Sequence, residues 1–122
     1  MIKAILSFLL LLLFTVTPVF AASPDASLRL DPTRRYVFLT FTNIQTVSKV
    51  NYVLTYITNN VTKGFEGGFR TYGRLRRSVR RQILGTCSSG RCVFHKNPNS
   101  FQLDVTFYLK SGGTTTVTKS LP

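Results

Sequence analysis

Alternation of apolar and polar side chains is clearest near the end of the chain. In residues 101–110 every odd-numbered position is Phe, Leu or Val, and every even-numbered position is polar or Tyr. Because the side chains of a β-strand point alternately to its two faces, this period of two predicts a strand with one buried and one solvated face. Gly112 and Gly113 then predict a tight reversal into a threonine-rich strand over residues 114–121.

Two earlier segments alternate in the same way. In residues 36–42 we expect Val37, Leu39 and Phe41 to face the core, and β-branched and aromatic residues support a strand. Residues 50–58 predict a second strand that buries its even-numbered members from Val50 to Tyr56, after a turn over residues 43–49.

Weaker patterns predict shorter strands at residues 27–30, 61–64 and about 80–86. Gly64, Gly67 and Gly68 should loosen the chain after the second of these. In the third, a strand would place Val79, Arg81 and Ile83 on one face, which points Arg81 inward. A helical turn with Leu75, Val79 and Ile83 on one stripe is the alternative.

These elements together predict an all-β protein. Short strands separated by turn residues at this spacing are typical of a single antiparallel two-sheet sandwich. About one hundred residues follow the first apolar segment, which is the size of one domain.

The segment over residues 36–121 resembles a fibronectin type III domain. The resemblance is carried by Tyr52-Val53-Leu54-Thr55-Tyr56 as a central strand and by residues 101–110 with the Gly-Gly hairpin that follows. Residues 84–95 are also similar to a Gly-Thr-Cys-Ser-Ser-Gly-x-Cys hairpin of small exported bacterial domains of that kind. The chain lacks Trp, so Phe41 would fill the usual core Trp position, and another immunoglobulin-like topology is the second choice. The resemblance implies a structural or binding module that is not an enzyme.

The N-terminus has the build of a secretory signal over residues 1–21. Lys3 supplies a positive charge, and an apolar run follows. In Val19-Phe20-Ala21 the first and last residues place small side chains three and one positions before a cut between Ala21 and Ala22. The expected organisation is a signal peptide at 1–21, a leader with a first strand at 22–35, and the β domain at 36–122. The protein would then be secreted, extracellular or at the cell surface, and an uncleaved N-terminal anchor in the membrane is the alternative.

Export changes how the two cysteines are interpreted. Cys87 and Cys92 are separated by four residues, among them Gly90, which fits the tip of a hairpin closed by a disulfide. A metal site formed by Cys87, Cys92 and His95 is the alternative, but the sequence suggests no fourth ligand. We therefore expect a structural disulfide, and no metal or cofactor.

Charge adds a candidate function. Of the 16 basic residues only Lys3 precedes Ala22, so residues 22–122 hold 15 basic against four acidic residues, a net charge of +11. Such an imbalance attracts polyanions such as nucleic acid and surface polysaccharide. Arginine forks match phosphates and carboxylates, and neighbouring aromatic rings can stack on bases or sugars. The candidate polyanion-binding residues are Arg70, Arg74, Arg76, Arg77, Arg80 and Arg81. The alternative is a solvated strand edge whose charges discourage pairing with other chains.

The sequence offers few residues that could form a catalytic site. Hydrolysis by paired carboxylates would have to draw on four acidic residues, and a Ser-His-Asp arrangement only on His95 with Asp104. The expectation is an exported, non-enzymatic binding or surface-structural module. Its partner would be an unidentified protein, met by outward aromatic side chains such as Phe38 and Tyr108, or an anionic polymer at the cell surface.

Overall fold

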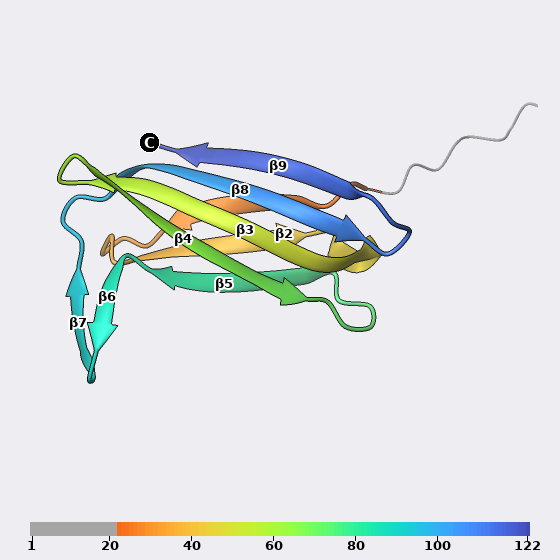
Figure 1. The fold of residues 1–122 in the computed structure, drawn as a ribbon, viewed down its shortest axis with the longest axis horizontal. Helices are drawn as coiled ribbons and strands as arrows, with labels where there is room; N and C mark the ends of the chain where they lie inside the picture. Colours follow the sequence, from red (N-terminus) through yellow and green to blue (C-terminus); the bar gives the residue numbers. More distant parts are fainter. Residues whose placement is uncertain (1–21) are drawn as a thin grey trace, which may run out of the picture.

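The computed structural model describes residues 22–122; the expected signal peptide at 1–21, its cleavage and the alternative membrane anchor therefore lie outside the described residues. Nine strands and one short 3-10 helix make up the described part (Figure 1). In chain order they are β1 (Asp25–Leu30), β2 (Tyr36–Thr42), η2 (Ile44–Thr46), β3 (Val47–Thr58), β4 (Val61–Arg70), β5 (Arg77–Ile83), β6 (Gly85–Ser88), β7 (Arg91–Phe94), β8 (Asn99–Leu109) and β9 (Thr114–Leu121).

The strands form three antiparallel sheets, which confirms the all-β prediction. One sheet has the order β1-β2-β5, the second β4-β3-β8-β9, and the third is the β6-β7 hairpin. In Figure 1 the four-stranded sheet lies in front of the three-stranded sheet, and the β6-β7 hairpin extends away from one end of both.

The inner faces of the two larger sheets share one hydrophobic core. It contains most of the predicted core residues of β2, β3 and β8, which are almost fully buried: Val37, Leu39, Phe41, Val50, Leu54, Tyr56, Phe101, Leu103, Val105 and Phe107. Tyr52 and Leu109, which were predicted for the same faces, are only partly buried against this core. The ring centroid of Phe41 on β2 lies 5.5 Å from that of Tyr52 on β3 and 5.3 Å from that of Phe69 on β4. Burial of each such side chain stabilises the fold by roughly 1.5 to 3 kcal/mol, so this core holds the two sheets together.

Several element boundaries differ from the predictions. The expected turn over residues 43–49 is shorter, because Asn43 adopts a left-handed conformation that starts η2, and β3 already begins at Val47. The first strand begins at Asp25 and pairs with β2 along its whole length. Asn59 and Asn60 both have positive φ angles, as the tight turn between β3 and β4 requires.

Strand β4 corrects the expectation that glycines loosen the chain. It continues to Arg70 and pairs with β3 throughout. The ring of Tyr52 packs against Gly67, where a Cβ atom would collide with it, and a Cβ on Gly68 would lie 2.7 Å from Oδ1 of Asn51. Side chains of β3 therefore fill the space beside these two glycines, and this packing keeps β4 ordered.

Strand β5 corrects a second prediction. It starts at Arg77, not near Arg80, and it is neither helical nor oriented with Arg81 inward. Arg81 is paired with Phe38 and lies with it on the outer face, while Arg80 is paired with the buried Leu39 on the inner side. Because β5 is a sheet edge, its inner side reaches the open margin between the sheets, and a long polar side chain can lie there.

Each open margin between the two sheets is bridged by a cationic side chain. The guanidinium of Arg80 on β5 lies 4.5 Å from the ring centroid of Phe69 on β4. On the opposite margin Nζ of Lys119 on β9 lies 3.3 Å from a carboxylate oxygen of Asp25 on β1. Both contacts are partly exposed and contribute at most about 1 kcal/mol each, but they place charge on edges that would otherwise pair with other chains.

The predicted disulfide hairpin is confirmed. Cys87 on β6 and Cys92 on β7 are directly opposed and bonded, with their Cα atoms 4.0 Å apart. Ser89 and Gly90 at the tip have the positive φ angles of a tight turn. The hairpin residues beyond Gly85 and before Phe94 are all exposed, so the disulfide stiffens a projecting element and not the core.

Candidate anion-binding surface

The six arginines predicted as one polyanion site occupy different parts of the fold. Arg70 is the last residue of β4 and is paired with Lys49 of β3 on the outer face of the four-stranded sheet. Arg74 and Arg76 are exposed in the loop between β4 and β5, beside Tyr72, which is 79% exposed.

The remaining three members lie on β5, but they are divided between its two sides. Arg77 and Arg81 lie on the outer face of the three-stranded sheet, opposite Thr42 and Phe38 of β2. Arg80 points to the inner side and covers Phe69. The sequence cluster is therefore not a single surface.

A different set of arginines is brought together on the three-stranded sheet. The guanidinium of Arg81 lies 4.6 Å from the ring centroid of Tyr36, and that of Arg29 on β1 lies 4.5 Å from the ring centroid of Phe38. These contacts cross all three strands of the sheet, because Phe38 is paired with Arg29 on one side and with Arg81 on the other.

The array continues toward the projecting hairpin. Arg35, in the turn before β2, lies 4.8 Å from the ring centroid of Phe94 on β7. The Phe94 ring meets the Tyr36 ring edge to face, with centroids 5.9 Å apart. We call the resulting surface the arginine-aromatic face, and its members are Arg29, Arg35, Tyr36, Phe38, Arg81 and Phe94.

The contacts with aromatic rings leave these arginines able to bind anions. A cation over an aromatic ring at an exposed site is stabilised by about 0.5 to 1 kcal/mol. Where an arginine stacks on a ring, the contact uses the flat side of its guanidinium. The N–H groups at its margin stay available for bidentate bonds to phosphate, sulfate or carboxylate. Among residues 22–122 no carboxylate forms an ion pair with Arg29, Arg35 or Arg81.

Sequence reasoning missed half of this face. Arg29 and Arg35 are far from the arginine cluster in the sequence, and Phe94 belongs to the hairpin. The available signal was Phe38, which alternation already placed on the outer face of its strand. The register of three strands is needed to show that arginines lie on both sides of it.

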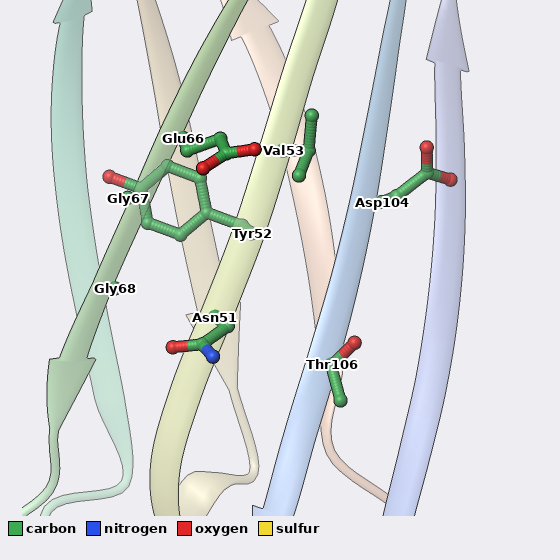
Figure 2. Close-up of a pocket in the computed structure, with 8 residues that line it drawn as sticks. All are labelled: Asn51, Tyr52, Val53, Glu66, Gly67, Gly68, Asp104 and Thr106. Carbon is green, nitrogen blue, oxygen red and sulfur yellow. The ribbon is translucent and has the colours of Figure 1, made fainter.

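One part of the outer face of the four-stranded sheet, away from Lys49 and Arg70, has the opposite chemistry (Figure 2). An open hollow of about 490 Å³ lies there, lined by Asn51, Tyr52, Val53, Glu66, Gly67, Gly68, Asp104 and Thr106. Figure 2 shows Glu66 and Asp104 on either side of Val53, with which both are paired. Asp104 accepts a hydrogen bond of 2.8 Å from Oγ1 of Thr118, so this carboxylate is held in the face of the sheet. A hollow that is lined by two carboxylates and by no lysine or arginine does not suit a polyanion.

Among residues 22–122 the Ser-His-Asp and metal-site alternatives are not assembled. The disulfide occupies both cysteine sulfurs, and residues 22–122 contain no group of three metal-ligating side chains. His95 and Asp104 do not meet, because Nδ1 of His95 lies 2.6 Å from the hydroxyl of Tyr56 while Asp104 faces outward on β8.

The contact between Tyr56 and His95 fixes the base of the hairpin. The ring of His95 is half-buried, and its centroid lies 5.8 Å from that of Tyr56. Burial raises the pKa of Tyr56 from 10.0 to about 12. The phenol therefore keeps its proton at neutral pH and can donate it to Nδ1 of His95.

Comparisons of the chain with models of protein families, with curated protein sequences and with solved structures found no match. Within the part of the chain that the structure describes, no helix is long and apolar enough to cross a membrane.

Proposed function

We propose that the protein is an exported binding module with a fibronectin type III-like sandwich fold, which binds anionic polymers by contact and without turnover. The observation that carries this proposal is the arginine-aromatic face, where three arginines are stacked on three aromatic rings. A net charge of +11 over residues 22–122 would speed the approach of a polyanion, and the stacked arginines would hold it.

Strand order supports the fibronectin type III-like assignment. In an immunoglobulin constant-type sandwich the fourth strand joins the sheet of the first, second and fifth strands. Here β4 pairs with β3, and the first sheet contains only β1, β2 and β5. The resemblance seen in the sequence and this pairing therefore favour the same fold.

The shape of the face supports a polymeric ligand. Three arginine-aromatic pairs extend from β1 across the sheet to β7, over a surface built from rigid strands. Guanidinium groups bind phosphate or sulfate without reading a sequence, and exposed ring edges can meet bases or sugars. Single-stranded nucleic acid and sulfated or uronic polysaccharide are two kinds of polymer with this chemistry.

A salt series with two variants of equal charge tests the proposal. The first variant changes Arg29, Arg35 and Arg81 to Gln, and the matched control changes Arg70, Arg74 and Arg76 to Gln. Each lost contact should reduce the slope of log affinity against log salt by about 0.7 to 0.9, so the first variant should lose about 2 to 3 in slope. The control should keep a slope close to that of the unchanged protein. Equal losses in both variants would show that only overall charge matters.

Export is a separate part of the proposal, supported by the signal-like residues 1–21 and by the Cys87–Cys92 disulfide. N-terminal sequencing of the protein taken from cells tests it. A chain that starts at Ala22 supports a released protein, whereas an intact Met1 on membrane-bound protein supports the anchored alternative.

A further inference from the structure

A second hollow lies at the base of the projecting hairpin and shares only Phe94 with the arginine-aromatic face. It has a volume of about 380 Å³ and lies between the end of β7 and the turn that joins β3 to β4. Its walls include Val61, Lys63, Val93, Phe94, His95 and Lys96.

The polar part of this hollow is cationic. Lys63 and Lys96 come from segments on opposite sides of it, and no carboxylate is among its lining residues. Nδ1 of His95 lies 2.6 Å from the hydroxyl of Tyr56, and when this nitrogen accepts the hydroxyl proton, Nε2 carries a ring proton. Among the hydrogen bonds of residues 22–122, none uses this Nε2 group, which leaves a third donor for a ligand.

The remaining wall is apolar and exposed to water. Val93 is 68% exposed and Val61 is 51% exposed, although both line the hollow. Cations alone would attract any anion, but phosphate or polysaccharide would leave these side chains in water. A ligand that covers them needs an apolar part, and covering apolar surface contributes about 25 cal/mol per Å².

The hollow is held in shape before any ligand arrives. Oγ1 of Thr58 donates a 2.6 Å hydrogen bond to the carbonyl oxygen of Lys96, and the amide of His95 donates to the carbonyl oxygen of Leu84 at 2.9 Å. The Cys87–Cys92 disulfide fixes the strand that carries Val93. A preformed site loses less conformational entropy when it binds.

From this arrangement we infer that the hollow binds a carboxylate attached to an apolar body. The carboxylate pairs with Lys63, Lys96 and the Nε2–H group of His95, and the apolar body lies against Val61 and Val93. Two molecules have this chemistry, namely a polypeptide chain that ends in an apolar residue and a free aliphatic acid. The inference is independent of the arginine-aromatic face.

The test uses three ligands and the oxidised protein exported by cells that express the full chain. They are acetyl-Ala-Ala-Leu with a free carboxylate, the same peptide as its C-terminal amide, and octanoate. Amide signals of residues 59–63 and 93–96 should move in two-dimensional NMR spectra when a carboxylate ligand is added. The amide should bind about ten-fold more weakly than the free peptide, because its loss of charge removes the ion pairs.

The comparison of ligands separates the two sources. Tighter binding of the peptide than of octanoate assigns the site to chain ends, and equal or tighter binding of octanoate assigns it to free acids. Equal binding of the peptide acid and its amide would overturn the inference, as would the absence of saturable shifts with both carboxylates.

Variants with equal charge complete the test. Lys63→Gln with Lys96→Gln should weaken carboxylate binding about ten-fold, while Lys49→Gln with Lys110→Gln should change it less than about two-fold. Both pairs are surface substitutions away from the core, so both proteins should fold. Equal weakening in the two variants would show that the hollow contributes only through net charge and would contradict a built site.

Discussion

Replacement of Tyr56 by Phe should change how stability depends on alkaline pH. The Tyr56 side chain is 1% exposed, and its burial raises its pKa from 10.0 to about 12. Because the pKa of Tyr56 is higher in the folded protein than in the unfolded chain, the neutral buried phenol contributes its full stabilisation of the fold below pH 10. This stabilisation is lost as the pH rises from 10 toward 12, since ionisation then favours the unfolded chain.

The size of the effect follows from these two values. At pH 11 the unfolded phenol with a pKa of 10.0 is mostly ionised and the folded one with a pKa of about 12 is mostly neutral. The difference corresponds to about 1.4 kcal/mol of lost stability between pH 8 and pH 11. Tyr56→Phe should not suffer this loss, although at pH 8 it should be about 1 kcal/mol less stable because the hydrogen bond to His95 is gone.

Urea denaturation at pH 8, 10 and 11 measures this directly, followed by far-ultraviolet circular dichroism. The useful quantity is the difference in stability between each variant and the unchanged protein at the same pH, because this difference isolates the substituted side chain. Tyr72→Phe is the control, because Tyr72 is 79% exposed. If the Tyr56→Phe and Tyr72→Phe proteins lose the same stability between pH 8 and pH 11, the argument from burial of Tyr56 is refuted.

Two other substitutions test the fold. Replacing Cys87 and Cys92 by Ser should lower the free energy of unfolding by only about 2 kcal/mol, because the disulfide closes a short, exposed loop; a loss of folding seen by circular dichroism would contradict this. Gly67→Ala should cost about 1 to 3 kcal/mol in thermal or urea denaturation, because its methyl group would collide with the ring of Tyr52. Gly64→Ala is the comparison and should be nearly neutral, since its nearest contact would be at 3.8 Å.

The strands with strict alternation could be predicted from the sequence. Residues 101–107 bury their odd-numbered members as expected, Leu109 is partly buried, and residues 114–121 form β9 with the predicted limits. The disulfide was also predictable, because a four-residue gap containing Gly90 fits a hairpin in an exported chain. In each case the pattern lies within a few neighbouring residues.

Features that depend on pairing between strands could not be predicted in this way. Gly67 and Gly68 would weaken an isolated strand, and only the side chains of Tyr52 and Asn51 on the adjacent strand stabilise them. Likewise, the inward or outward orientation of Arg81 depends on which strand β5 joins, and alternation alone does not reveal it.

The candidate sites show the same limit. Six arginines close in the sequence suggested one surface, but the sheet separates Arg80 from Arg81 because neighbouring residues of a strand face opposite sides. Arg29 reaches the arginine-aromatic face only through the pairing of β1 with β2. The hollow beside His95 needs contacts between the β3-β4 turn and the end of β7, more than thirty residues apart in the sequence.

The most direct test of anion binding is to observe the guanidinium groups themselves. Arginine Nε–Hε signals of the isotope-labelled protein would be recorded during titration with a single-stranded oligonucleotide and with heparin. We predict that the signals of Arg29, Arg35 and Arg81 shift first and saturate together with the binding curve. Uniform small shifts of all exposed arginines, or first shifts at Arg70, Arg74 and Arg76, would contradict binding at the arginine-aromatic face.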